Sequence, residues 1–159
     1  MSYPPPRYLG DGGSVSATFR PADHAPELVY PNGGSVHYLA TGDSTAGGFG
    51  LYRWEMGAEP SGPGPHFHRS ISESFFVLTG TVRIFNGVEW LETGPGDFVH
   101  VPVGGIHGFR NESGAPASML LHFAPGAPRE GYFEGIVGLA DLTDEERAEF
   151  FLRHDNVWL

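Results

Sequence analysis

The chain has 159 residues, a length typical of one domain, and 40% of them are hydrophobic, which is enough for a packed core. Its 9 basic and 19 acidic residues give a net charge of −10, which disfavours nucleic acids and membrane surfaces as partners. Because it has no lysine and no cysteine, the chain cannot use a lysine Schiff base, a thiolate nucleophile, a disulfide or a thiolate-bound metal.

Glycine and proline divide most of the chain into short apolar-rich runs, and this pattern is typical of an all-β sandwich or barrel. Residues 1–13 form a Pro/Gly-rich tail, and we expect no helix before residue 125. Strands are predicted over residues 14–19, 35–40, 49–56, 74–78, 81–85, 88–92, 97–101, 108–111 and 117–123. The predicted β-barrel therefore extends over residues 14–124.

The clearest hairpin signal is Asn86-Gly87, which lies between the predicted strands 81–85 and 88–92. Asn-Gly tolerates the positive φ angles of a two-residue type I′ turn. The sequence therefore predicts a tight hairpin at this point.

After the barrel, residues 125–159 are predicted to form a helical extension. Pro128 is suited to the start of a short helix over 129–137. Thr143 and Glu146 have the spacing of a capping box, which predicts the start of a second helix.

No apolar run approaches the length of a membrane helix, and residues 1–10 lack the pattern of a secretory signal. We therefore expect a soluble, cytoplasmic protein. Small β-barrels have open sheet edges that need covering, so we also expect a homodimer, in which residues 15–19 could pair with the sheet of the second copy.

Three histidines and one glutamate have a spacing that suggests a common site. His66 and His68 are separated by one residue, so both side chains point to one face of an extended segment. Glu73 follows after a predicted turn, and His107 comes from a separate Gly- and Pro-rich stretch. Three imidazoles and a carboxylate suit one divalent transition metal (Fe, Mn, Ni, Cu, Co or Zn) with positions left open. A single histidine in a β protein more often has a purely structural role, and only the spacing of the four residues favours a site.

Two longer motifs contain these four residues. Residues 66–80 have the pattern H-x-H-x4-E-x6-G, and residues 96–111 have the pattern G-x5-P-x-G-x2-H-x3-N. Together they resemble the two motifs of the cupin family. The resemblance implies a small double-stranded β-helix, or jelly-roll, barrel. It also implies that His66, His68, Glu73 and His107 are the metal ligands.

Side chains that alternate with the ligands, or with one another on a strand, are candidates for a substrate pocket. A hydrophobic or aromatic small molecule is the expected ligand, although core packing alone also explains most of these residues. The candidates are Tyr52, Trp54, Phe75, Phe109 and His122.

Cupins host many activities, so the fold alone does not decide the function. The complete ligand set favours a metal enzyme, and the arrangement resembles quercetinase-type dioxygenases, which cleave hydroxylated aromatic or enol-type molecules with oxygen. Glu73 could then act as the general base, and the helical extension could cover the barrel mouth as a lid. The alternatives are a non-redox cyclase or isomerase of polyketide-like substrates, and a small-ligand-binding cupin without turnover.

Overall fold

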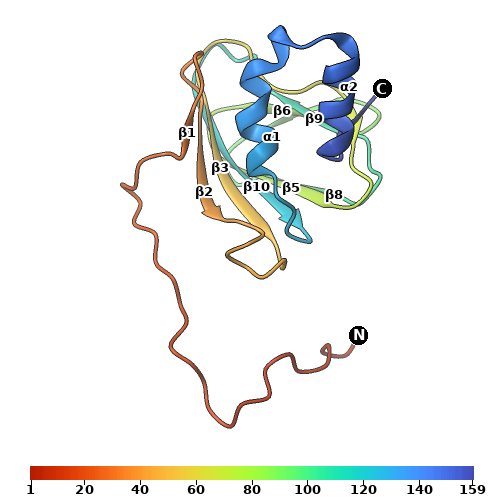
Figure 1. The fold of residues 1–159 in the computed structure, drawn as a ribbon. Helices are drawn as coiled ribbons and strands as arrows, with labels where there is room; N and C mark the ends of the chain where they lie inside the picture. Colours follow the sequence, from red (N-terminus) through yellow and green to blue (C-terminus); the bar gives the residue numbers. More distant parts are fainter.

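Antiparallel sheets followed by short helices make up the computed structural model, which describes residues 1–159 (Figure 1). The strands are β1 (Leu28–Val29), β2 (Ser35–Ala40), β3 (Gly50–Met56), β4 (His66–Phe67), β5 (Ser72–Thr79), β6 (Val82–Phe85), β7 (Trp90–Thr93), β8 (Phe98–Val101), β9 (Gly108–Arg110), β10 (Ala117–Ala124) and β11 (Val157–Trp158). The helices are α1 (Glu130–Gly135), the 3-10 helix η1 (Ile136–Asp141) and α2 (Asp144–Arg153). None of them combines the length and the apolar character needed to cross a bilayer.

The strands form a small barrel. A 6-stranded sheet has the order β1-β2-β3-β10-β5-β8, a 3-stranded sheet has the order β7-β6-β9, and β11 pairs with β4. Strands distant in sequence are neighbours in the large sheet, which is the antiparallel pattern of a jelly roll. The all-β barrel with a short C-terminal helical extension is therefore confirmed.

Alternation along the central strands creates the core. Tyr52 and Met56 on β3, Phe75 on β5, and Met119 and Leu121 on β10 are all buried. In each strand the neighbouring side chains point to the other face of the sheet, as the pleat requires. The inner faces of β3, β5 and β10 thus form one apolar layer in the core of the barrel.

The hairpin at Asn86-Gly87 forms, but its turn differs from the prediction. Phe85 pairs with Trp90, so residues 86–89 make a longer connection in place of a two-residue type I′ turn. Gly87 has a φ of 93°, whereas the Asn86 side chain accepts hydrogen bonds from the backbone N–H groups of residues 88 and 89. These hydrogen bonds compete with the tighter turn that the dipeptide favours.

The predicted strand over residues 14–19 is absent, and the first strand begins at Leu28. The first 19 residues are exposed and extend away from the barrel (Figure 1), and Val15 and Phe19 are fully or largely exposed. Alternating polarity favours a strand only where a neighbouring strand supplies hydrogen-bond partners, and this segment has none within the chain. The exchange of this segment onto a second copy stays a prediction.

The C-terminal extension packs over the barrel (Figure 1). Phe133 of α1 is buried, and its ring lies 5.0 Å from Tyr52 and 5.2 Å from Trp54, between ring centroids. The first predicted helix becomes a 3-10 helix after Gly135, whereas the capping box of Thr143 and Glu146 forms as predicted. The extension is thus joined to the barrel by aromatic packing.

Replacing Thr143 with alanine should lower the free energy of unfolding by about 1 kcal/mol, because the Thr143 hydroxyl accepts the N–H of Glu146 at the start of α2. Urea denaturation measures this loss. Thr143→Ser keeps the hydroxyl and should remain close to the wild type. Equal midpoints for the alanine and serine variants would contradict the expectation.

Candidate metal centre and cavity

The four residues that the sequence singles out meet inside the barrel. His66 lies on β4, His68 follows it, Glu73 lies on β5, and His107 immediately precedes β9. Their candidate ligand atoms lie within 4.8 Å of one another, and no side chain of the four is more than 4% exposed. His66 and His107 also pair through their backbones, with both N···O distances at 2.8 Å. The strands thus bring two distant motifs to one point.

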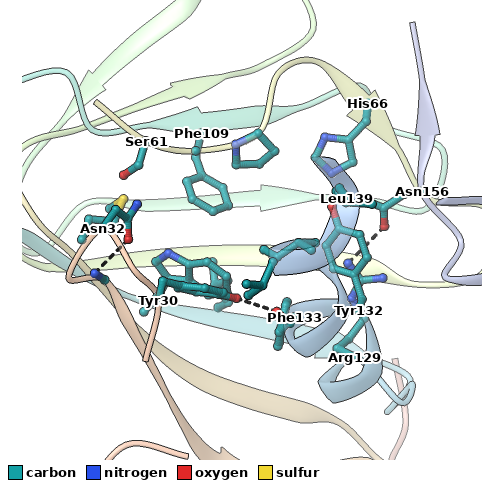
Figure 2. A pocket seen from close by; sticks show the side chains of 18 of the residues that line it. Tyr30, Asn32, Ser61, His66, Phe109, Arg129, Tyr132, Phe133, Leu139 and Asn156 are labelled. Atoms are coloured by element: carbon teal, nitrogen blue, oxygen red, sulfur yellow. Dashed lines mark hydrogen bonds between the residues drawn. The ribbon is translucent and has the colours of Figure 1, made fainter. Parts of the chain in front are cut away.

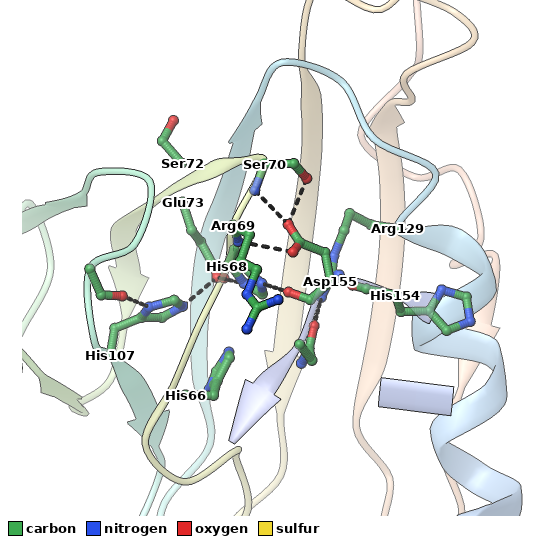
Figure 3. Close-up of polar contacts among 12 residues, drawn as sticks. His66, His68, Arg69, Ser70, Ser72, Glu73, His107, Arg129, His154 and Asp155 are labelled. Atoms are coloured by element: carbon green, nitrogen blue, oxygen red, sulfur yellow. Dashed lines mark hydrogen bonds and ion pairs between the residues drawn. The ribbon is translucent and has the colours of Figure 1, made fainter. Parts of the chain in front are cut away.

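Hydrogen bonds at Nδ1 determine which nitrogen of each imidazole faces the centre. His66 and His107 each contact the carbonyl oxygen two residues earlier, at 2.9 Å. His68 contacts the carbonyl oxygen of Asp155 at 2.6 Å (Figure 3). A carbonyl oxygen only accepts, so each Nδ1 carries the proton and donates it. In the neutral rings each Nε2 then carries a lone pair, which is the tautomer that a metal ligand needs.

The centre of the cluster requires a cation. The same Oε2 atom of Glu73 lies 3.1 Å from His68 Nε2 and 2.8 Å from His107 Nε2. With neutral imidazoles, these contacts would place lone pairs against a buried carboxylate, which is unfavourable in the absence of a proton or a metal ion between them. Three nitrogen donors and one carboxylate around one buried point fit a single divalent transition metal.

Burial and hydrogen bonding shift the pKa values of the cluster residues in opposite directions. Burial acts to raise the pKa of Glu73, but hydrogen bonds from His107 and His68 outweigh it and hold that pKa below its ordinary value. Burial lowers the pKa of His66 to about 4, so this ring is neutral near pH 7. Burial also acts to lower the pKa of His107, but the hydrogen bond to Glu73 outweighs it and raises that pKa. The carboxylate is therefore anionic and has a neutral imidazole beside it.

A cavity of about 540 Å³ adjoins the cluster, and His66 and Glu73 form part of its wall (Figure 2). This volume is within the usual range for small-molecule sites. Much of the wall is apolar, and it comes from both the barrel and the C-terminal extension. Its apolar residues include Trp54, Phe109, Phe123, Phe133, Leu139 and Phe151.

Two of the five pocket residues proposed from the sequence, Trp54 and Phe109, line this cavity. Tyr52 and Phe75 point inward as expected, but they are fully buried in the core and do not line it. The expected place of His122 in the pocket is not observed, because its ring stacks on Phe49, with 5.6 Å between the ring centroids. Its neighbours on β10, residues 121 and 123, face the cavity, so alternation places His122 on the other face of the sheet.

The last residues of the chain belong to the site, and sequence reasoning missed them. Trp158 pairs with His66 through β11 and β4, and their ring centroids lie 4.9 Å apart. The Asp155 carboxylate accepts hydrogen bonds from the backbone N–H groups of Arg69 and Ser70, at 2.9 and 2.8 Å (Figure 3). A two-residue strand has too little periodicity to be recognised, and its pairing partner, β4, lies far away in the sequence at residues 66–67.

Part of the chain is similar in sequence to known proteins. A family model of the cupin domain matches residues 52–123. Over 48 residues the chain is 33% identical to quercetin 2,3-dioxygenase of Bacillus subtilis, a segment that covers 30% of this chain and 14% of that protein. The chain thus matches far less than two thirds of that enzyme's length.

Solved structures show the same fold. KdgF from Halomonas sp. superposes with a TM-score of 0.61 at 17% identity, covering 72% of this chain and 97% of that one. The polyketide cyclase RemF from Streptomyces resistomycificus superposes with a TM-score of 0.55 at 24% identity, covering 67% and 78%. All four residues of the buried cluster lie within residues 52–123, the part of the chain that matches the cupin domain, and the chain shares its fold with these structures.

Proposed function

We propose that this chain is a metal-dependent enzyme, a quercetinase-like dioxygenase that cleaves a small hydroxylated aromatic or enol-type molecule with oxygen. The observation that carries the proposal is the direct opening of the buried His/Glu cluster into an aromatic-lined cavity. The sequence similarity to a quercetin dioxygenase supports the same reaction class. A small hydrophobic or aromatic substrate suits the wall of the cavity.

His66, His68, Glu73 and His107 would hold one divalent transition metal, which supplies Lewis acidity and, for a redox-active ion, electron transfer to oxygen. Glu73 is both a cluster residue and part of the cavity wall, so its carboxylate is positioned to take a proton from a substrate hydroxyl. The aromatic wall holds the substrate ring and excludes water from it.

Oxygen uptake with quercetin and related flavonols tests the proposal, using protein loaded in turn with each candidate metal. Glu73→Gln should lower kcat by about 100-fold or more, because the amide cannot accept the substrate proton. Glu55→Gln is the matched control: Glu55 also lines the cavity, but it lies on β3 outside the cluster.

Three outcomes separate the candidate functions. Oxygen uptake that depends on the metal and on Glu73 supports the dioxygenase. Full activity of Glu73→Gln with its metal retained would rule out the general base. Turnover of polyketide-like substrates without oxygen uptake would identify the non-redox cyclase or isomerase, and binding without any turnover would leave a ligand-binding role.

A further inference from the structure

Three buried polar groups along the cavity lack a hydrogen-bond partner. They are Arg129 Nε, Asn156 Nδ2 and Trp158 Nε1. All three are N–H donors, and all three come from the C-terminal extension. Native proteins rarely leave buried donors unpaired, because the lost hydrogen bond to water is not replaced. Several such donors on one cavity wall indicate a ligand that supplies acceptor atoms.

Arg129 adds a buried positive charge to this wall, with no carboxylate in direct contact. Its side chain is 4% exposed, and its two terminal nitrogens donate to uncharged acceptors: the carbonyl oxygen of His154 at 2.6 Å and the amide oxygen of Asn156 at 3.1 Å. No carboxylate lies within ion-pair distance. The guanidinium instead lies over aromatic rings, 4.4 Å from the Tyr132 centroid and 5.1 Å from that of Phe123. Buried charges in proteins are ordinarily paired, whereas the carboxylates of Glu73 and Asp155 act on this one only from beyond ion-pair distance.

The donors lie at the cluster end of the cavity. Figure 2 shows Arg129 and Asn156 on the same side as His66, and the Trp158 ring lies 4.9 Å from the His66 ring. Glu73 is the one carboxylate among the buried residues. A metal ion bound by the cluster would offset its charge, so Glu73 would no longer balance the charge of Arg129. This end of the cavity therefore favours an anion.

We propose that Arg129, Asn156 and Trp158 bind a carboxylate group of the substrate, so that this cavity takes small aromatic acids. The planar guanidinium matches the geometry of a carboxylate, and the amide and indole N–H groups add donors to the same oxygens. The proposal deepens the proposed function, since it names the substrate class of that same site. The apolar wall opposite would hold the ring.

The test compares two probes with the same ring system, 2-naphthoate and the uncharged 2-naphthamide, by calorimetric titration of the full-length protein. The wild type should bind the acid at least about tenfold more tightly than the amide. Arg129→Gln should abolish this preference. Arg153→Gln removes the same charge from an exposed position outside the cavity and should retain the preference.

A second variant tests the proposal even if Arg129→Gln does not fold. Asn156→Asp keeps the oxygen that accepts from Arg129, so the fold should survive, but it supplies a counter-charge and removes the amide donor. Its affinity for 2-naphthoate should fall about tenfold or more, while its affinity for 2-naphthamide should stay the same. Metal content is measured for each variant, and affinities are compared only between proteins with equal metal content. A bound ion then attracts the acid equally in each comparison.

Two results would overturn the proposal. One is equal affinity of the wild type for the acid and the amide. The other is wild-type affinity for 2-naphthoate in a folded Asn156→Asp variant. Because binding is measured without turnover, failure to consume oxygen would reject the dioxygenase while leaving the acid-binding site intact. Conversely, flavonol turnover without acid preference would reject only the acid-binding site.

Discussion

Protein purified without a metal-affinity tag should carry about one transition-metal ion per chain, and the variant with both His66 and His68 changed to alanine should carry none. The double change removes two of the four donors that meet within 4.8 Å. Elemental analysis measures the content directly. A chelator should also lower the melting temperature of the wild type and not that of the variant, because an ion that binds only the folded state stabilises it.

The matched control is the double change of His100 and His122 to alanine. It also removes two imidazoles, but His100 bonds to Ser74 and His122 stacks on Phe49, both away from the cluster. This control should keep its metal. Full metal content in the His66/His68 variant would contradict the assignment, as would a wild type that cannot be loaded with any of the six candidate metals.

Ending the chain after Arg153 should weaken metal binding by about 10- to 100-fold, the usual consequence of losing groups that orient metal ligands. The truncation removes the carbonyl oxygen that accepts the Nδ1 proton of His68 and the strand that pairs with His66. Both imidazoles then lose a constraint on their orientation. Competition with a chromogenic chelator measures the affinity, and circular dichroism shows whether the barrel is retained.

Two variants separate the contributions of this tail. Removing only Leu159, which is exposed, should leave metal affinity unchanged. Asp155→Ala keeps the backbone carbonyl that contacts His68 but loses the carboxylate that holds Arg69 and Ser70, so an intermediate affinity is expected. A folded truncated protein with wild-type metal affinity would show that the tail does not orient the ligands.

Local patterns in the sequence were enough to identify the four cluster residues. His66 and His68 share a face because strands have a period of two, and Glu73 and His107 have the spacing of two known motifs. The capping box at Thr143 is equally local, since its two side chains lie three residues apart and bond only to each other's backbone. Such features depend on near neighbours in the chain, and the predictions agree with the structure.

The strand predicted over residues 14–19 and the pocket role of His122 failed for a different reason. A strand forms only beside a neighbouring strand, and a pocket residue must lie on the face of the sheet that lines the pocket. Neither condition can be read from the segment itself. In the structure residues 14–19 have no adjacent strand, and His122 faces outward beside Phe49.

By itself, the sequence determined the β-rich barrel, the helical extension and the identity of the cluster residues, because periodicity and motif spacing are properties of short segments. Only the tertiary structure decided that Asp155 holds His68, that Trp158 pairs with His66, and that Arg129 faces the cavity. His68 and Asp155 are 87 positions apart. No local pattern specifies contacts at that separation, because they form only when the extension packs its aromatic side chains against the barrel.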